Sequence, residues 1–242
     1  MQTEVHSDAW AVAEAAAEFI ATDARRCVAE RGRFVLGVSG GRTPSMMLRA
    51  LADLAVPWDG VHVCQVDERV APLGDPARNF TQLQECLLAR VPLCPEQVHA
   101  MPVEQMDLDS AARSYAAVLR ALAGTPPVLD LVHLGLGVDG HTASLVPGDP
   151  SLGVLDEEVA LAGPYQGHRR MTLTFPVLDR ARRVLWVVTG EEKSSMLRRM
   201  QAGDRTIPAG RVRQQSAMLI ADLAAVTGLH TEQRALKADD HR

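Results

Sequence analysis

The sequence predicts an α/β fold in which a mostly parallel sheet carries helices on both faces. Short apolar segments with β-branched residues alternate along the chain with longer segments of helical apolar spacing. Polar or glycine-rich turns follow several of these apolar segments, as expected at the carboxyl edge of a parallel sheet, where ligands bind. Because 47% of the 242 residues are hydrophobic, we expect a single domain with a substantial core over residues 1–242.

In the first half of the chain, predicted helices alternate with two predicted strands. The elements are a helix at residues 8–31, a strand at 34–38, a helix at 46–54, a strand at 61–66 and a helix at 79–90. The first helix carries Asp and Glu at helical intervals, so it is amphipathic and does not predict a membrane span. Thr43 is a natural N-cap for the second helix, and Pro44 is a natural first residue.

The second half of the chain continues the alternation. We predict a helix at residues 110–123, strands at 128–134, 171–175 and 184–188, and a helix at 191–200 with Lys193 in its first turn. His133 lies inside a predicted strand, which is typical of a packed histidine. The polar tail at residues 230–242 is predicted to be frayed.

The composition excludes several classes of partner. A net charge of -5 and a pI near 5.9 argue against a nucleic acid or a membrane surface, since both favour a basic face. The four cysteines have no zinc-site spacing and are typical of reduced thiols in the cytosol. We therefore expect a cytoplasmic protein, a monomer or a dimer, that acts on a small molecule.

The loop after the strand at 128–134 contains the densest set of reactive side chains. Residues 135–140 match the G-x-G-x-x-G pattern of dinucleotide-binding loops, which requires a helix directly afterwards. Here Pro147-Gly148 leaves no room for that helix, so the pattern does not predict dinucleotide binding. Asp139 and His141 in a strand-end loop instead indicate proton transfer. The histidine and carboxylate spacing of a metal site is absent from the sequence.

Residues 39–44 join a strand to a helix start, where free backbone N–H groups favour an anion such as phosphate. The alternative is an ordinary glycine turn with a Thr-Pro cap. Lys193 near the start of a helix opposes the helix dipole, which indicates an anionic partner or, alternatively, a solvated lysine.

Three charged residues, Asp67, Glu68 and Arg69, end the strand at 61–66. Charges at a strand end are expected to reach solvent, and this interpretation suits Glu68. The Arg69 guanidinium at the edge of the sheet is suited to stabilising an oxyanion or a phosphate.

Several of these segments resemble the 6-phosphogluconolactonase family. The matching segments are residues 39–44, 67–72 with Asn79, 135–148, 170–174, 189–193 and 208–212. The similarity runs in order from about residue 10 to residue 225. It implies a Rossmann-like α/β fold of the sugar-phosphate isomerase type and hydrolysis of 6-phospho-D-glucono-1,5-lactone in the oxidative pentose phosphate pathway.

The resemblance and the local chemistry together predict the site. We expect catalysis by His141, Asp139 and Arg69. We expect the substrate and its phosphate to contact Ser39, Gly40, Gly41, Arg42, Thr43, Asp67, Asn79, Thr142, Arg170 and Lys193. Hydrolysis of an activated ester needs only water activation and charge stabilisation, so no metal or organic cofactor is predicted.

The chain departs from the family pattern at two positions. Val146 stands where the family has Phe, a packing change, and Arg78 stands where the family has Ser, which we expect to alter the rim of the pocket and the role of Asn79. One alternative is a glucosamine-6-phosphate deaminase, a relative that has Tyr and Glu where this chain has Arg69 and Val146. A non-catalytic sugar-phosphate sensor is the other, against which the presence of His141 and Arg69 speaks.

Overall fold

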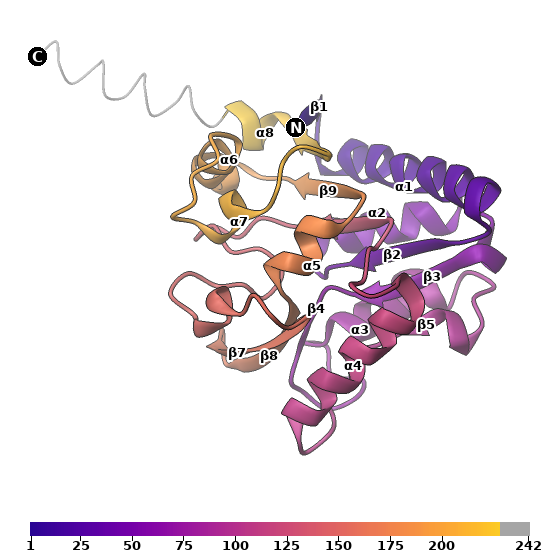
Figure 1. The fold of residues 1–242 in the computed structure, drawn as a ribbon. Coiled ribbons are helices and arrows are strands. Elements are labelled where there is room, and N and C mark those ends of the chain that lie inside the picture. The colour runs from indigo at the N-terminus through magenta and orange to yellow at the C-terminus, as the bar shows by residue number, and fades with distance from the viewer. Residues whose placement is uncertain (228–242) are drawn as a thin grey trace, which may run out of the picture.

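Seven parallel strands form the central sheet of the computed structural model, which describes residues 1–227 (Figure 1). Its strands are β1 (Gln2–His6), β2 (Phe34–Val38), β3 (Val61–Gln65), β5 (Val98–His99), β6 (Leu131–Leu134), β9 (Arg183–Val188) and β10 (Ala217–Asp222). Their spatial order is β1-β10-β9-β6-β2-β3-β5, and every neighbouring pair is parallel. The predicted α/β class with a mostly parallel sheet is confirmed, whereas the predicted frayed tail at 230–242 lies outside the described residues.

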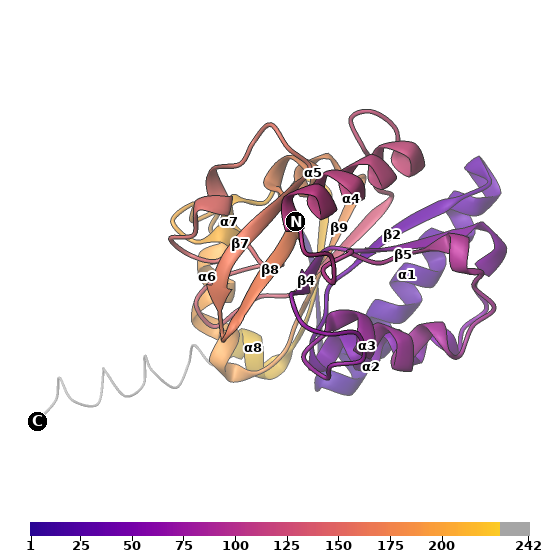
Figure 2. The same ribbon diagram turned by 90° about the horizontal axis from the view of Figure 1, so that it is seen from below.

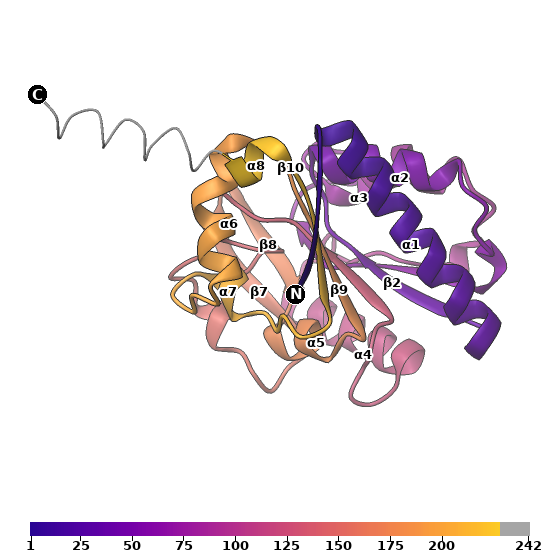
Figure 3. The same cartoon turned by 90° about the horizontal axis from the view of Figure 1, so that it is seen from above.

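Helices cover both faces of this sheet. They are α1 (Ala9–Arg31), α2 (Arg42–Ala52), α3 (Asn79–Leu83) with a π-helical continuation (Gln84–Leu88), α4 (Leu108–Ala123), α5 (Phe175–Arg180), α6 (Ser194–Gln201), α7 (Pro208–Arg211) and α8 (Leu223–Thr227). Helices α1 and α2 lie over one face, and α4 and α5 lie over the other (Figure 3). In β2, Phe34 and Leu36 pack toward α1 while Val35 packs toward α4, as the alternation of strand side chains requires.

Local capping explains the ends of α1. The Asp8 carboxylate accepts hydrogen bonds from the backbone N–H groups of Trp10 and Ala11, both at 3.0 Å. Gly32 ends the helix with φ +73°, a conformation that glycine adopts without strain. The predicted helix at 8–31 is confirmed.

Helix α2 begins earlier than the sequence predicts. Its N-cap is Gly41, at φ +129°, and the first intrahelical bond runs from Ser45 N–H to Gly41 C=O at 3.0 Å. The Thr43 hydroxyl caps nothing and lies 2.6 Å from the Thr189 hydroxyl. The predicted Thr43 cap is therefore wrong, and Pro44 occupies the first helical turn, where a missing N–H leaves no acceptor unsatisfied.

A second, antiparallel sheet lies beside the first. It consists of β4 (Asp67–Arg69), β8 (His168–Leu173) and β7 (Val159–Tyr165), in that spatial order (Figure 2). The segment predicted as a strand at 171–175 therefore belongs largely to this small sheet and not to the parallel one. The pairing of β4 with β8 sets Arg69 opposite Arg170, so two predicted site residues become neighbours.

Glu68 is completely buried, which corrects the expectation that this charge reaches solvent. Its carboxylate accepts hydrogen bonds from the side chain of Gln65 and from the backbone N–H groups of Arg69, Asn79 and Phe80, at 2.7–2.9 Å. The Nε of Arg78 lies 2.9 Å from the same carboxylate. Glu68 thus joins β4 to the start of α3.

Arg78 is also buried, with 1% of its side chain exposed, so the expectation that it alters the rim of the pocket is wrong. Its guanidinium contacts the carboxylates of Glu68 and Glu104 and donates to the Ala71 carbonyl at 3.0 Å. The two carboxylates compensate the buried positive charge of Arg78. Through these contacts, Arg78 fixes the loop that precedes α3.

Replacing Glu68 with Ala should destabilise the fold strongly. The substitution leaves the Arg78 charge and several backbone N–H groups without their buried partner, and breaking such a pair costs about 3–5 kcal/mol. We expect the free energy of unfolding in urea to fall by that amount. The exposed Glu85→Ala variant is the control and should stay within about 0.5 kcal/mol of the parent. A Glu68→Ala loss as small as that of the control would contradict the assigned network.

Candidate active site

The strand order reverses between β2 and β6, and a cavity opens there. From β2 the chain moves outward to β3 and β5, whereas β6, β9 and β10 extend in the other direction. The loops after β2 and β6 therefore diverge, which is the arrangement that creates ligand sites in open α/β sheets. The cavity has a volume of about 220 Å³. It is lined by Ser39, Gly40, Gly41, Asp67, Arg69, Asn79, Gly135, Leu136, Gly137, His141, Ala143, Arg170 and Lys193.

His133 in β6 is hydrogen-bonded to Ser39 in the loop that follows β2. It is fully buried, and burial lowers its pKa to about 4, so the ring is neutral. Its Nδ1 accepts from the Ser39 backbone N–H at 3.3 Å, and its carbonyl accepts from the Ser39 hydroxyl at 3.1 Å. The prediction of a packed histidine is confirmed.

Asp139 and His141 form a hydrogen-bonded pair at the cavity wall. His141 Nδ1 lies 2.6 Å from Asp139 Oδ1, and the same oxygen accepts from the His141 backbone N–H at 3.1 Å. Because Nδ1 faces the carboxylate, Nε2 is the nitrogen left for a reacting molecule. This is the geometry of a general base that is oriented by an acid.

Glycines shape the turn that carries this pair. Gly140 has φ +84°, and a Cβ atom there would lie 2.7 Å from Cβ of Ile207. The Gly140 N–H donates to the Gly137 carbonyl at 3.0 Å, and the Gly137 N–H donates to the His141 carbonyl at 2.8 Å. The next helical segment begins only at Pro150, so the prediction that no helix directly follows the G-x-G-x-x-G pattern is confirmed.

The hydrogen bonds around Asp139 favour the charged form of its carboxylate. Partial burial opposes ionisation, but hydrogen bonds from the backbone and ring of His141 and from the Tyr165 hydroxyl outweigh it and lower the pKa of Asp139. Tyr165 donates to Asp139 Oδ2 at 3.1 Å. The sequence did not indicate a role for this tyrosine, which lies in β7, outside the Asp-Gly-His loop.

Two arginines lie side by side on another wall of the cavity. Arg170, which is 3% exposed, is held by two hydrogen bonds to the Tyr165 carbonyl at 3.2 and 3.3 Å. Arg69 donates to the Ala77 carbonyl at 2.6 Å. Burial and then the charge of Arg69 lower the pKa of Arg170, as expected for like charges in close proximity. Such a pair attracts an anion or a developing oxyanion.

Asp67 lies two residues before Arg69 on β4, and it is 4% exposed. Burial raises its pKa, although the Ser144 hydroxyl donates to its Oδ2 at 2.7 Å. The Ser144 hydroxyl in turn lies 3.4 Å from Nη1 of Arg170. Ser144 therefore links the Asp-Gly-His loop to the small sheet, a contact that the sequence did not indicate.

Gly40 allows Asn79 to approach the loop after β2. A Cβ atom on Gly40 would lie 2.0 Å from Asn79 Oδ1. Asn79 Nδ2 donates to the Asp67 carbonyl at 2.9 Å, whereas the buried Oδ1 has no partner among the described residues. Asn79 lines the cavity, and its Oδ1 is a buried acceptor packed against Gly40.

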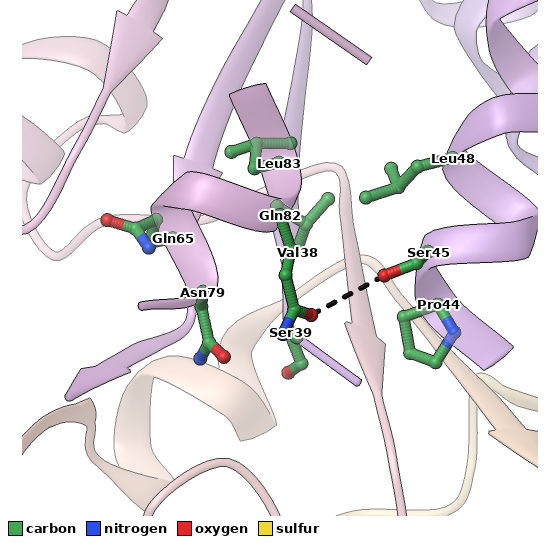
Figure 4. A pocket seen from close by; sticks show the side chains of 10 residues that line it. Val38, Ser39, Pro44, Ser45, Leu48, Gln65, Asn79, Gln82 and Leu83 are labelled. Carbon is green, nitrogen blue, oxygen red and sulfur yellow. Dashed lines mark hydrogen bonds between the residues drawn. The ribbon is translucent and has the colours of Figure 1, made fainter. Parts of the chain in front are cut away.

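Gln82 of α3 contacts the same loop (Figure 4). Its Oε1 accepts from the Gly41 backbone N–H at 3.3 Å and lies 3.4 Å from the Ser45 hydroxyl. The Gly41 N–H is thus engaged and not free for a phosphate, in contrast to the prediction. The first-turn N–H groups of Arg42 and Thr43 have no intrahelical acceptor and remain available to an anion.

An adjoining hollow extends the cavity past Lys193. Arg42, Thr43, Thr189 and Lys193 line it, together with glycines shared with the main cavity. Lys193 makes no ion pair with any residue in the range 1–227. The turn that carries it is fixed by Gly190, whose N–H donates to the buried Asp222 carboxylate at 3.0 and 3.1 Å.

The structure does not bring every predicted residue to the cavity. Thr142 is fully buried, and its hydroxyl donates to the Gly135 carbonyl at 2.9 Å, so it closes the loop instead of facing the cavity. The expected substrate contact of Thr142 is therefore corrected. Arg42 is exposed and reaches only the adjoining hollow.

Within residues 1–227, no three His, Cys, Asp or Glu side chains gather closely enough to hold a metal ion. None of the helices described there has the length and apolarity needed to cross a membrane.

The chain matches the family of glucosamine-6-phosphate isomerases/6-phosphogluconolactonase over residues 7–221. It belongs to this family. A 6-phosphogluconolactonase from Synechocystis sp. is 34% identical over 207 residues, which cover 83% of this chain and 86% of that protein. The family match over residues 7–221 includes the loops after β2, β3, β6 and β9.

Solved structures agree with this assignment. The crystal structure of 6-phosphogluconolactonase from Thermotoga maritima has a TM-score of 0.82 and 28% identity, covering 91% of this chain and 98% of its own. A monomeric glucosamine-6-phosphate deaminase has a TM-score of 0.83 at 17% identity and covers 94% of this chain and 100% of its own. That second likeness concerns the fold alone, so the fold does not separate the two activities.

Gly40→Ala should damage the site without harming the fold. The added methyl group would displace Asn79 from the cavity, and a displacement of about 1 Å can cost up to about a hundredfold in activity. We expect kcat/KM of the family reaction to fall while the melting temperature changes little. Gly153→Ala, where an added Cβ meets open space, is the control and should keep its activity. Equal activity in both variants would show that Asn79 does not need its observed position.

Proposed function

We propose that this chain hydrolyses 6-phospho-D-glucono-1,5-lactone to 6-phospho-D-gluconate in the oxidative pentose phosphate pathway. One observation carries the proposal: His141, which is paired with Asp139, lines a cavity whose other walls present Arg69, Arg170 and Lys193. A general base opposite a cluster of cations suits hydrolysis of an anionic ester. Family membership and the names of the relatives support the same reaction.

The substrate phosphate is proposed to bind between the start of α2 and Lys193. The Arg42 and Thr43 N–H groups, the helix dipole and the Lys193 ammonium all favour an anion there. Ser39, Gly40 and Gly41 form the adjoining wall, where the absence of side chains on the glycines permits close approach. Holding the remote phosphate fixes the position of the lactone ring.

The lactone carbonyl then lies between His141 and the two arginines. His141 Nδ1 donates to Asp139, and Nε2 accepts a proton from the water that attacks the carbonyl carbon. Arg69, assisted by Arg170, stabilises the tetrahedral oxyanion. The imidazolium returns its proton to the ring oxygen as the ester bond breaks, which leaves the acid and an open chain. The Asn79 side chain lines the cavity beside the sugar, and the Ser144 hydroxyl bridges Asp67 to Arg170.

This chemistry needs no metal or organic cofactor, since water activation and charge stabilisation are both supplied by side chains. The acidic composition and the cysteine pattern support a cytoplasmic enzyme with no nucleic-acid or membrane partner, and we propose that it is a monomer or a dimer.

Incubation with glucosamine 6-phosphate tests the alternative that the chain is a deaminase. If the chain were instead a non-catalytic sugar-phosphate sensor, it would bind the lactone without hydrolysing it.

His141→Ala should lower kcat by about a hundredfold to ten-thousandfold, because it removes the general base. The assay follows the loss of 6-phosphogluconolactone and subtracts its spontaneous hydrolysis. Affinity for the product 6-phosphogluconate should change little, since the phosphate contacts remain. A variant with near-parental kcat would remove His141 from the mechanism, and a parent without turnover would refute the proposed function.

Plain δ-gluconolactone should be a poorer substrate than its 6-phosphate by about two decades or more in kcat/KM. The missing phosphate removes several charge-assisted hydrogen bonds at about 1.5–3 kcal/mol each, and each ~1.4 kcal/mol is tenfold. Lys193→Ala should raise KM for the phosphorylated lactone and leave the plain lactone nearly unaffected.

The charge-matched control is Arg49→Ala, which removes an exposed cation at the far end of α2. It should leave both substrates unchanged. A Lys193→Ala penalty of equal size on both lactones would show that the phosphate site is misassigned.

A further inference from the structure

Tyr165 stands at the tip of the β7–β8 hairpin, directly before the turn. It pairs with His168 across a two-residue turn, in which Gln166 and Gly167 have φ +52° and +84°. Such turns match the twist of the flanking strands and are well defined. The strand register shifts between Ala162 and Tyr165, an irregularity that redirects side chains at a strand end. The hairpin thus gives Tyr165 a definite orientation.

The Tyr165 ring contacts both members of the acid–base pair. Its hydroxyl donates to Asp139 Oδ2 at 3.1 Å and lies 3.4 Å from His141 Nδ1. The rings of Tyr165 and His141 meet edge to face, with centroids 5.1 Å apart and an interplanar angle of 65°. Both carboxylate oxygens of Asp139 are therefore used: Oδ1 by His141 and Oδ2 by Tyr165.

Arg170 holds Tyr165 from the other side. Its guanidinium lies 5.0 Å from the ring centroid of Tyr165, and its Nε and Nη2 donate to the Tyr165 carbonyl. Tyr165 thus links the acid–base pair to the arginine pair. It does not line the cavity, so any effect on the reaction passes through the residues that it contacts, Asp139, His141 and Arg170.

We propose that Tyr165 is a positioning residue of the hydrolytic site, whose hydroxyl orients the Asp139 carboxylate so that His141 Nε2 points into the cavity. This inference rests on the proposed lactone hydrolysis. The need for such a residue follows from the turn that carries Asp139: its side chain is one-third exposed, and its neighbour Val138 is 55% exposed. The backbone N–H and ring of His141 both contact Oδ1, so Tyr165 supplies the contact that fixes Oδ2 and with it the plane of the carboxylate.

The contact also adjusts the charge of the pair. Burial and then the Asp139 carboxylate raise the pKa of Tyr165, so the phenol remains a donor at neutral pH. By donating, it draws negative charge away from Asp139 and weakens the attraction of the carboxylate for a protonated His141. The other charged groups around the cavity are Arg69 and Asp67 on β4, Arg170 on β8 and Lys193 before α6, and none of them changes when the hydroxyl is removed.

Tyr165→Phe tests the proposal, because it removes the hydroxyl and keeps the ring and the carbonyl that Arg170 contacts. We expect kcat to fall about two- to tenfold, the scale of one hydrogen bond, with KM nearly unchanged. The acidic limb of the kcat/KM profile should move to higher pH, since the carboxylate then stabilises the protonated pair more strongly. In an Asp139→Asn background, Tyr165→Phe should cause no further loss.

The matched control is Tyr115→Phe, since Tyr115 and Tyr165 are the two tyrosines of the chain. The Tyr115 hydroxyl donates to the Gln65 carbonyl inside the core, so the control loses a hydroxyl away from the acid–base pair. It should lower the melting temperature without moving the acidic limb. A Tyr165→Phe variant that loses stability and activity with an unmoved pH profile would overturn the inference, as would a full additional loss in the Asp139→Asn background.

A readout that needs no turnover separates this inference from the proposed function. In Tyr115→Phe, the near-ultraviolet absorbance of phenolate reports Tyr165 alone. Adding Asp139→Asn should lower the midpoint of that titration, because the neighbouring negative charge is gone. An unchanged midpoint would overturn the contact between Tyr165 and Asp139. Absence of lactone turnover in the parent enzyme would overturn the proposed function instead.

Discussion

The buried carboxylate of Glu68 is the interaction on which the geometry of the site depends. A charge in a fully buried strand is tolerated only when donors surround it, and here three backbone N–H groups, one amide and the Arg78 guanidinium do so. The donors come from both β4 and the start of α3, so the carboxylate holds these two segments together. Asp67 and Arg69, its neighbours in β4, and Asn79 at the start of α3 face the cavity as a result.

The same strand brings the arginines together. Because β4 pairs with β8 in antiparallel register, Arg69 lies opposite Arg170, and the β7–β8 hairpin carries Tyr165 to Asp139. The protein has a net charge of -5, yet its cavity presents three permanent cations, Arg69, Arg170 and Lys193, against one carboxylate, Asp67, whose pKa is raised by burial. An acidic protein thus concentrates positive potential at one point, which favours an anionic ligand locally.

The central sheet does not determine which reaction the protein catalyses. A deaminase shares it at a TM-score of 0.83, so the identity of the reaction depends on the side chains that follow β2, β3, β6 and β9. Glycines at Gly40 and Gly140 serve this arrangement: the first admits Asn79, and the second permits the turn that carries Asp139 and His141. Ser39, His141 and Lys193 lie in the segments that follow parallel strands, whereas Arg69 and Arg170 lie on the small antiparallel sheet.

The sequence by itself determined the features that depend on neighbouring residues. Helix α1, the strands β2, β3, β6 and β9, and the absence of a helix after Gly140 all follow from local periodicity and local breakers. The candidates His141, Asp139, Arg69 and Lys193 were likewise recognisable, because reactive residues at strand ends form a local pattern and match a family motif.

Only the tertiary structure decided the features that depend on distant partners. Edge strand β1 exposes most of its side chains, and β7 contains Gly-Pro, so neither has a strong local strand signal, and both form because β10 and β8 supply their hydrogen bonds. The burial of Glu68 and Arg78 and the contact of Tyr165 with Asp139 join residues separated along the chain. Local propensity does not encode such contacts, because they contribute to stability only after folding has brought the partner residues together.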